Sequence, residues 1–247
     1  MSATRLPGKP LLKINGLSII SHVYKKAKNA NIGEVIVAAE DQEIVNDVKN
    51  NGGNAILTGN SHKTGTDRIF EAFSILGRDD INYIMNIQGD EPEIDIGDIK
   101  NLDQKMKLNS SKVGTLAAKI LDSRMYESEN IVKVQIKESF NQNSFPTAKN
   151  FMRNTNIREN IFHHIGVYCY EIKTLQKIIS FNQSQNEVKN KLEQPDHKRK
   201  AKNLGNKLSF SASDPRTSRW IICILRKATS IGLSNPFRRS AARTLST

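Results

Sequence analysis

The stretch EVIVAAEDQEIVNDVKNNGGNAILT, residues 34–58, decides the fold class. Its first seven residues are mostly apolar and β-branched, as in a strand that is buried on both faces of a parallel sheet. Residues 41–51 then repeat apolar side chains at helical spacing and end at Gly52 and Gly53. A second strand-like run, AILT, follows at 55–58. A strand, a helix and a strand in this order indicate an α/β unit with parallel strands.

The same alternation continues on both sides of this stretch. Apolar side chains at helical spacing predict helices, and short runs of β-branched or aromatic residues predict strands. We expect helices over 17–30, 66–76, 174–181 and 187–194, and strands over 82–88, 112–120, 131–137 and 163–170. The fold class expected from this pattern is α/β with a mostly parallel sheet.

Composition excludes several classes of protein. The chain of 247 residues is 37% hydrophobic, which is enough to bury a core of ordinary size. No apolar run approaches the ~20 residues that span a bilayer, and the first residues lack the regions of a signal peptide. Cys169 and Cys223 lie far apart, without the spacing of a zinc site or of a disulfide framework. We therefore expect a cytoplasmic protein without a membrane partner, in which Cys169 is a small core residue.

The net charge of +12 is concentrated at one end of the chain. Residues 195–247 hold 12 Lys and Arg against 2 acidic residues, whereas residues 1–194 hold 25 against 23. This break predicts a body over 1–194 and a basic tail of uncertain fold over 195–247. Binding to nucleic acid is not expected of the body, and only the tail has the charge for it.

Two acidic residues follow the predicted strand 82–88, in the sequence QGDEP (88–92). In an open parallel sheet, ligands bind at the carboxyl ends of the strands. Asp90 and Glu91 at such an end suit a Mg²⁺ ion that bridges phosphate oxygens. The alternative is an ordinary surface β-turn, for which Gly, Asp and Pro are typical residues.

Two further stretches have features of anion-binding sites. In HKTGTDR (62–68), Thr66 can cap the helix that follows, and the N-terminus of a helix favours phosphate. In TRLPGKPL (4–11), Arg5 offers a planar fork for phosphate oxygens, Lys9 a point charge and Pro7-Gly8 a turn. The alternatives are an ordinary helix cap and an exposed basic loop.

These stretches, together with N-x-Q-G-D-E-P and H-x-G-x-Y (164–168), occur in one order along residues 2–194. In that order they resemble the 3-deoxy-manno-octulosonate cytidylyltransferases, also called CMP-Kdo synthetases. The resemblance implies a three-layer fold of the nucleotide-diphospho-sugar transferase type. It also implies a smaller strand-rich elaboration for dimerisation and sugar binding, and a homodimer. The reaction implied is transfer of the cytidylyl group from CTP to Kdo, an acidic eight-carbon sugar, with release of pyrophosphate and with Mg²⁺ as cofactor.

The resemblance also implies roles for individual residues. Lys9 and Asp90 would be catalytic, and Asp90 would be the Mg²⁺ ligand. The residues implied in nucleotide binding are Thr4, Arg5, Leu6, Lys9, Thr66 and Gln88. The residues implied in sugar binding are Arg153, His164, Tyr168, Glu193 and Gln194. Arg153 could pair with the sugar carboxylate, and a neutral His164 could donate a hydrogen bond to the carboxylate or to hydroxyls.

The chain also departs from the family pattern in three places. Family members begin with an apolar strand ending in P-A-R, which is the central strand of their sheet, and we expect this first strand to be missing here because the sequence starts after it. An F-S-R segment of the family is replaced by NSFPTAKN (143–150). After LEQ (192–194) the sequence looks frame-shifted, and it lacks the V-D-T-x-x-D-L element that carries the second Mg²⁺ ligand. From these departures we expect unpaired strand edges in the sheet and impaired turnover. The alternative functions are a catalytically inactive nucleotide-binding remnant and a nucleic-acid-binding protein.

Overall fold

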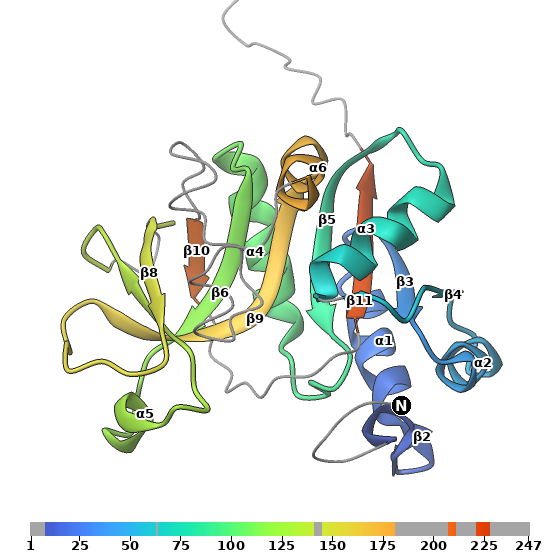
Figure 1. Ribbon diagram of the computed structural model, residues 1–247, viewed down its shortest axis with the longest axis horizontal. Coiled ribbons are helices and arrows are strands. Elements are labelled where there is room, and N and C mark those ends of the chain that lie inside the picture. Colours follow the sequence, from blue (N-terminus) through green and yellow to red (C-terminus); the bar gives the residue numbers. More distant parts are fainter. Residues whose placement is uncertain (1–7, 63, 141–144, 181–206, 211–220, 228–247) are drawn as a thin grey trace, which may run out of the picture.

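The computed structural model describes residues 8–62, 64–140, 145–180, 207–210 and 221–227 (Figure 1). A sheet of nine strands forms the middle layer, and helices cover both of its faces. Seven strands follow one another across the sheet in the order β10-β6-β9-β5-β11-β3-β4, while β7 pairs with β8 and β9. The bounds of the strands are β3 Glu34–Ala39, β4 Ala55–Leu57, β5 Ile81–Gln88, β6 Val113–Ala118, β7 Lys133–Ile136, β8 Ala148–Met152, β9 Ile161–Glu171, β10 Lys207–Phe210 and β11 Ile221–Lys227.

Most strands of the sheet run in the same direction, but most neighbouring pairs of strands are antiparallel. The pairs β3·β4 and β10·β6 are parallel. Strands β9 and β11 run antiparallel to both of their neighbours on this path. As a result β3, β4, β5, β6 and β10 all point the same way, and their carboxyl ends meet at one edge. The expected α/β fold is confirmed. The reversed strands, which are β9, β11 and β8, are its departure from a simple parallel sheet.

Strand β11 occupies the position between β3 and β5 (Figure 1). Its residue Ile221 pairs with Ala38 on one side and with Gln88 on the other. The expectation of unpaired edges at this place is therefore wrong, because the backbone of β11 satisfies both neighbours. Strand β10 also comes from residues 195–247 and pairs with β6. Two segments of the basic tail thus belong to the same sheet as the body.

The helices divide between the two faces of the sheet. The bounds are α1 Ile19–Asn29, α2 Gln42–Asn50, α3 Gly65–Leu76, α4 Ile96–Leu108, α5 Arg124–Glu127 and α6 Ile172–Ile179. One apolar cluster joins α1, α2 and α4 to alternate strand residues such as Val35 and Val37. A second cluster joins α3 and α6 to the residues between them, such as Ile36 and Ala38. This alternation is the period of two expected of a strand buried on both faces, and it confirms the three-layer arrangement.

Several element boundaries differ from the sequence prediction. The helix expected over 17–30 begins at Ile19, because Leu17–Ser18 (β2) pairs with Lys13–Ile14 (β1) and Ser18 caps the helix by accepting from the backbone N–H of Ser21. Lys9–Leu11 forms a short 3₁₀ helix, η1. Helices α4 and α5 and strand β8 were not predicted. The predicted helix 187–194 lies outside the described residues.

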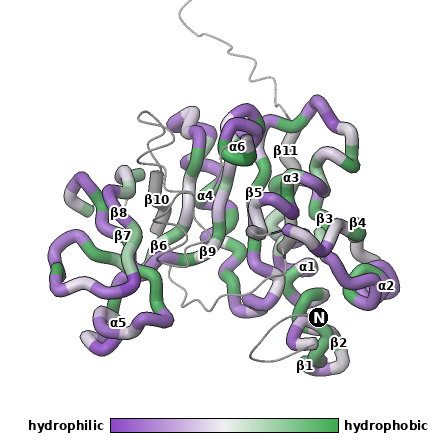
Figure 2. The backbone as a smooth tube through the Cα atoms, in the orientation of Figure 1, coloured by the Kyte–Doolittle hydropathy of each residue, from purple (hydrophilic) through white to green (hydrophobic). Residues whose placement is uncertain are grey.

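The hydropathy pattern agrees with this layering. Hydrophobic and hydrophilic residues alternate along α2, which lies at one end of the sheet (Figure 2). Its residues Ile44, Val45 and Val48 are buried and the residues between them are exposed or partly exposed. Cys169 is buried in the core, as expected. None of the helices in the described part of the chain is long and apolar enough to cross a membrane.

Candidate active site

The QGDEP turn lies at the carboxyl end of β5 and is buried. Asp90 is 4% exposed, and its side chain is fully covered. The backbone N–H of Glu91 reaches the carbonyl of Gln88 at 3.4 Å and closes the turn. A surface β-turn would leave its carboxylate in water, so burial of Asp90 contradicts the surface-turn alternative. A carboxylate kept in such a place needs a compensating partner.

Lys9 is that partner. Its Nζ donates to Oδ2 of Asp90 at 2.6 Å, across 81 positions of the chain. The loop that delivers Lys9 turns at Gly8, whose φ of +75° is a left-handed conformation that favours glycine. The second oxygen of Asp90, Oδ1, is buried and has no hydrogen-bond partner among the described residues. The structure therefore brings together the two residues that the sequence predicts to be catalytic.

Gln88 joins the end of β5 to β9. Its Nε2 donates to the carbonyl of Gly166 at 3.4 Å. A Cβ at position 166 would overlap the amide of Gln88, so the glycine of the H-x-G-x-Y motif provides the space in which Gln88 lies. The nucleotide-binding role predicted for Gln88 stays a prediction, and its position at the carboxyl edge is compatible with it.

Asn86 is a polar residue that the sequence reading passed over. It precedes Gln88 by two positions on β5, so both side chains point to the same face of the sheet. Asn86 is 7% exposed, and its Oδ1 has no hydrogen-bond partner within the described part of the chain. Across the strands it pairs in register with Tyr168 of β9. The N-x-Q spacing already carried this signal, because period two places Asn86 beside a predicted nucleotide contact.

Helix α3 begins one position earlier than expected, and its cap is a different threonine. Thr64 is the N-cap, with its hydroxyl accepting from the backbone N–H of Asp67 while the Asp67 carboxylate accepts from the backbone N–H of Thr64. This reciprocal capping box needs an acidic residue three positions after the cap, which Thr64 has. The expectation that Thr66 caps the helix is therefore wrong. Thr66 is buried in the first turn, and its predicted nucleotide contact is untested.

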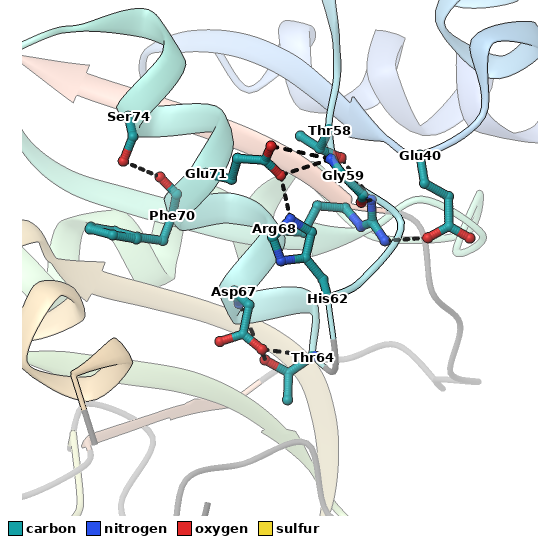
Figure 3. A network of polar contacts seen from close by, with 10 residues as sticks. All are labelled: Glu40, Thr58, Gly59, His62, Thr64, Asp67, Arg68, Phe70, Glu71 and Ser74. Carbon is teal, nitrogen blue, oxygen red and sulfur yellow. Dashed lines mark hydrogen bonds and ion pairs between the residues drawn. The ribbon is translucent and has the colours of Figure 1, made fainter. Parts of the chain in front are cut away.

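A buried arginine ties this helix to the ends of two strands (Figure 3). The guanidinium of Arg68 donates to the hydroxyl of Thr58 at 2.7 Å and to the carbonyl of Gly59 at 3.0 Å. It also pairs with Glu40, which follows β3. The first turn of α3 is thereby fixed at the carboxyl edge of the sheet. The motif T-G-T-D-R contains this arginine, but its sequence gave no indication of these partners.

A second pair holds the loop between β4 and α3 (Figure 3). The carboxylate of Glu71 accepts from the backbone N–H of Gly59 at 2.9 Å and contacts the imidazole of His62. The hydrogen bond from His62 is the main cause of a lowered pKa at Glu71. Glu71 of α3 therefore contacts both the Gly59 end and the His62 end of this loop.

His164 lies on β9, as the sequence predicts, and is only 6% exposed. Its Nε2 is 3.0 Å from the hydroxyl of Thr115 on β6. The ring of Phe151 meets it edge-on with centroids 5.0 Å apart, and the ring of Tyr168 lies at 5.4 Å. Burial, with a smaller contribution from His163, lowers the pKa of His164 to about 3. The imidazole is therefore neutral at physiological pH.

Arg153 follows β8, next to a buried lysine. The guanidinium of Arg153 donates to the carbonyl of Glu129 at 2.8 Å. Its own carbonyl accepts a hydrogen bond from Lys133, whose ammonium also donates to the carbonyl of Ser128 at 2.6 Å. Lys133 is 0% exposed, and burial lowers its pKa. The predicted pairing of Arg153 with a sugar carboxylate stays a prediction.

Five predicted site residues lie outside the described residues. These are Thr4, Arg5, Leu6, Glu193 and Gln194. Within the described ranges, no three His, Cys, Asp or Glu side chains gather as a metal-binding group. A Mg²⁺ ion that binds with its nucleotide does not need such a group, because it is held by one or two carboxylates with phosphate oxygens and water.

Comparisons with known proteins agree with the motifs. Residues 1–207 match the family model described as Cytidylyltransferase. The 3-deoxy-manno-octulosonate cytidylyltransferases of Afipia carboxidovorans and Nitrobacter winogradskyi are 38% and 39% identical to this chain. Each match covers 78% of this chain, and 79% and 77% of the two relatives. The chain belongs to the 3-deoxy-manno-octulosonate cytidylyltransferase family.

Solved structures support the same placement. A structure of CMP:2-keto-3-deoxy-manno-octonic acid synthetase complexed with CTP superposes with a TM-score of 0.74 at 32% identity. The match covers 87% of this cytidylyltransferase and 88% of that chain. A mannose-1-phosphate geranyltransferase from Thermus thermophilus gives a TM-score of 0.53 at 10% identity, over 82% of this chain and 67% of that one, and bears on the fold alone. The expected nucleotide-sugar transferase fold is confirmed.

Proposed function

We propose that this protein transfers the cytidylyl group of CTP to Kdo, giving the CMP-Kdo used in lipopolysaccharide biosynthesis, with release of pyrophosphate. The observation that carries the proposal is the pair between Lys9 and Asp90, 2.6 Å apart at the carboxyl end of β5 and next to Gln88. A partly exposed cation beside a buried carboxylate at this edge suits a triphosphate and its counter-ion. Relatives named 3-deoxy-manno-octulosonate cytidylyltransferase supply the substrate pair.

The reaction is a displacement at phosphorus. A hydroxyl oxygen of the sugar forms a bond to the α-phosphorus of CTP, the bond from that phosphorus to the β-phosphate oxygen breaks, and pyrophosphate leaves with its electrons. The hydroxyl proton passes to solvent or to a nearby base. Because little covalent chemistry falls to the protein, positioning and neutralisation of charge supply most of the acceleration.

The described residues have distinct parts in this proposal. The ammonium of Lys9 neutralises the triphosphate, and Gln88 and Thr66 lie beside the cytidine. Asp90 would hold Mg²⁺, because its buried Oδ1 has no hydrogen-bond partner among the described residues and carboxylate oxygen is the ligand that this ion prefers. When bound, the ion would neutralise charge on the phosphates. His164, Tyr168 and Arg153 would contact the sugar.

Neither alternative function receives support from the comparisons. The catalytically inactive remnant rested on expected damage to the sheet and on the missing element that carries the second Mg²⁺ ligand, and β11 fills the position where the damage to the sheet was expected. The nucleic-acid-binding alternative rested on the charge of residues 195–247, two segments of which pair in the sheet. Impaired turnover is not part of the proposal.

The test is release of pyrophosphate by the full chain with CTP, Kdo and Mg²⁺. We expect release that requires both substrates, and little release when ATP or GTP replaces CTP. Asp90→Asn should lower kcat by about a hundredfold or more, since it removes the charge of a metal ligand. Release that is independent of Kdo would contradict the proposed function.

Asp95→Asn is the matched control. Asp95 caps α4 by accepting from the backbone N–H of Gly97 and Asp98, and asparagine caps a helix equally well. The same chemical change five positions from Asp90 should therefore leave turnover unchanged. Full activity of Asp90→Asn at limiting Mg²⁺ would show that Asp90 does not bind the ion.

A homodimer and a cytoplasmic location complete the proposal. On the strand-rich segment expected to carry the dimer contact, Leu121 is 91% exposed and Ile157 is 49% exposed. A dimer contact over this segment would remove both side chains from water. Light scattering with size-exclusion chromatography should give about twice the 27.7 kDa of one chain, and the mass of one chain would contradict the dimer.

A further inference from the structure

The ammonium of Lys9 is bound to one of the two oxygens with which Asp90 would hold a metal ion. Its Nζ donates to Oδ2 of Asp90 at 2.6 Å. The other oxygen, Oδ1, is buried and has no hydrogen-bond partner among the described residues. The ammonium cancels the charge of the carboxylate, and a neutral pair attracts a divalent cation much less than a carboxylate without a counter-charge does. The pair is therefore poorly suited to binding a free metal ion.

The two side chains of this pair differ in their freedom to move. The side chain of Asp90 is 0% exposed, and it belongs to the turn that the hydrogen bond from Glu91 to Gln88 closes. The side chain of Lys9 is 32% exposed and ends a flexible four-carbon stem. When the pair separates, Lys9 can rotate toward solvent, whereas Asp90 stays in place.

The backbone that carries Lys9 is anchored independently of the pair. Lys9 begins η1, and its carbonyl accepts from the backbone N–H of Leu12 at 3.1 Å. The next residue, Pro10, is buried. Exchange of partners therefore requires movement of the Lys9 side chain alone. A triphosphate favours this exchange, because it offers an ammonium more negative charge than one carboxylate does.

We propose that Lys9 is a specificity-determining residue, whose ammonium blocks Asp90 to a free metal ion until a triphosphate draws it away, so that the site selects Mg²⁺ together with a nucleotide. This inference rests on the proposed function, in which Lys9 binds the triphosphate and Asp90 the ion. The ion and the nucleotide then bind cooperatively, and each raises the affinity for the other by the same factor.

Binding of the free ion can be measured without CTP or Kdo. Mn²⁺ is the probe, because it takes the same oxygen ligands as Mg²⁺ and its electron paramagnetic resonance signal decreases on binding. The unchanged full chain should bind Mn²⁺ weakly, and Lys9→Met should bind it about tenfold more tightly, a typical size for coupling between two sites. Adding Asp90→Asn to Lys9→Met should abolish this gain, which would locate the ion at Asp90.

Lys13→Met is the matched control. Lys13 lies on β1, four positions from Lys9, and is exposed. Its substitution removes the same charge from the same part of the chain without touching the pair. The affinity of Lys13→Met for Mn²⁺ should therefore stay within about twofold of the unchanged chain, since exposed charges are largely screened.

The affinity for the nucleotide should change in the opposite direction. In calorimetry with excess Mg²⁺, Lys9→Met should weaken binding of CTP about tenfold or more, because it removes a cation that pairs with phosphate. Lys13→Met should have little effect. A merely structural role of Lys9 would not give this pattern, because a general loss of structure would weaken binding of both the ion and the nucleotide.

The unchanged chain provides a test that does not depend on the folding of a variant. A ligand that binds only the folded state raises the melting temperature. Mg²⁺ alone should leave the melting temperature of the full chain unchanged, whereas CTP with Mg²⁺ should raise it. A rise with Mg²⁺ alone as large as with both would overturn the inference.

Two results with Mn²⁺ would also overturn it. Equal affinity of the unchanged chain and a folded Lys9→Met would show that Lys9 does not block the ion. A gain that persists with Asp90→Asn, or that Lys13→Met shares, would show a general effect of charge. Absence of CTP binding by the unchanged chain would instead contradict the proposed function, while the Mn²⁺ experiment would still decide whether Lys9 excludes the free ion.

Discussion

The two halves of the candidate site are built by different means. The proposed nucleotide half, comprising Lys9, Thr66, Gln88 and Asp90, lies at the ends of strands and at a helix start, and charged pairs secure it. The proposed sugar half, comprising Arg153, His164 and Tyr168, lies on and beside the antiparallel strands β6, β7, β8 and β9. There the described contacts run mostly to hydroxyls, carbonyls and rings.

This difference follows from what each half would bind. A triphosphate brings several negative charges, and cations with pre-arranged counter-charges suit it. A sugar brings mostly hydroxyls, which neutral donors and acceptors on rigid strands can distinguish. A buried cation lies beside each half. The partners of Arg68 include the carboxylate of Glu40, whereas Lys133 donates to the backbone carbonyls of Ser128 and Arg153. Removing each cation tests the comparison.

Arg68→Met should have the largest effect on stability. It removes a buried guanidinium that pairs with Glu40 and donates to Thr58 and Gly59, and breaking a buried ion pair costs about 3–5 kcal/mol. Chemical denaturation of the full chain measures the free energy of unfolding. Arg124→Met is the control, since Arg124 pairs with Asp122 at a similar distance but its side chain is 89% exposed. A loss for Arg68→Met no greater than for the control would contradict the importance of buried charge in the nucleotide half.

Lys133→Met should have a smaller effect. It leaves two neutral carbonyls, of Ser128 and Arg153, without a donor, which costs about 1–3 kcal/mol, and it removes a buried charge. The same denaturation experiment applies, with the exposed Lys137→Met as control. A loss of unfolding free energy as large as that of Arg68→Met would contradict the comparison, because the chemical nature of the partner would then not affect stability.

Glu71→Gln should have the smallest effect, and a pH dependence. A third of the Glu71 side chain is exposed, so its pairing with His62 is worth less than about 1 kcal/mol. The pKa of Glu71 is lower in the folded state than its ordinary 4.5, so the pairing stabilises the protein above pH 4.5 and is lost as pH falls through the folded pKa. Melting temperatures of both proteins should converge below that pH. The exposed Glu93→Gln should show no such convergence.

Local pattern predicted most of the central architecture. Strands at 34–39, 55–57 and 81–88 and the helices beside them lie where apolar periodicity placed them, because burial on both faces of a sheet imposes that periodicity. Helix α4 was also within reach, since Asp95 caps it and its buried residues recur at helical spacing. The cap of α3 was predicted at Thr66, two positions after the observed cap at Thr64, because both threonines lie close to the start of the helix.

The sequence predicted which residues belong to the candidate site better than it predicted the contacts between them. The QGDEP motif identified Asp90, and the opening loop identified Lys9, but only the packed sheet brings their side chains to 2.6 Å. Thr115 was missed because a polar residue inside a strand-like run has no local feature that distinguishes it, and Asn86 was missed although the N-x-Q spacing places it on the same face as Gln88. The bulge at Gly166 and Val167 depends on the register in which β9 pairs with β6, so it cannot be predicted from the sequence of either strand alone.

The amino-acid sequence by itself determined the α/β class, the order of strands and helices over the body, the motifs of the family and the acidic residues at the end of β5. These follow from interactions within about ten residues of the chain. The tertiary structure alone decided that β11 enters the sheet between β3 and β5, that Arg68 bonds Glu40, and that Thr115 faces His164. Each of these joins residues far apart in sequence, and such pairings depend on the packing of the whole sheet, because many strands could satisfy the same local pattern.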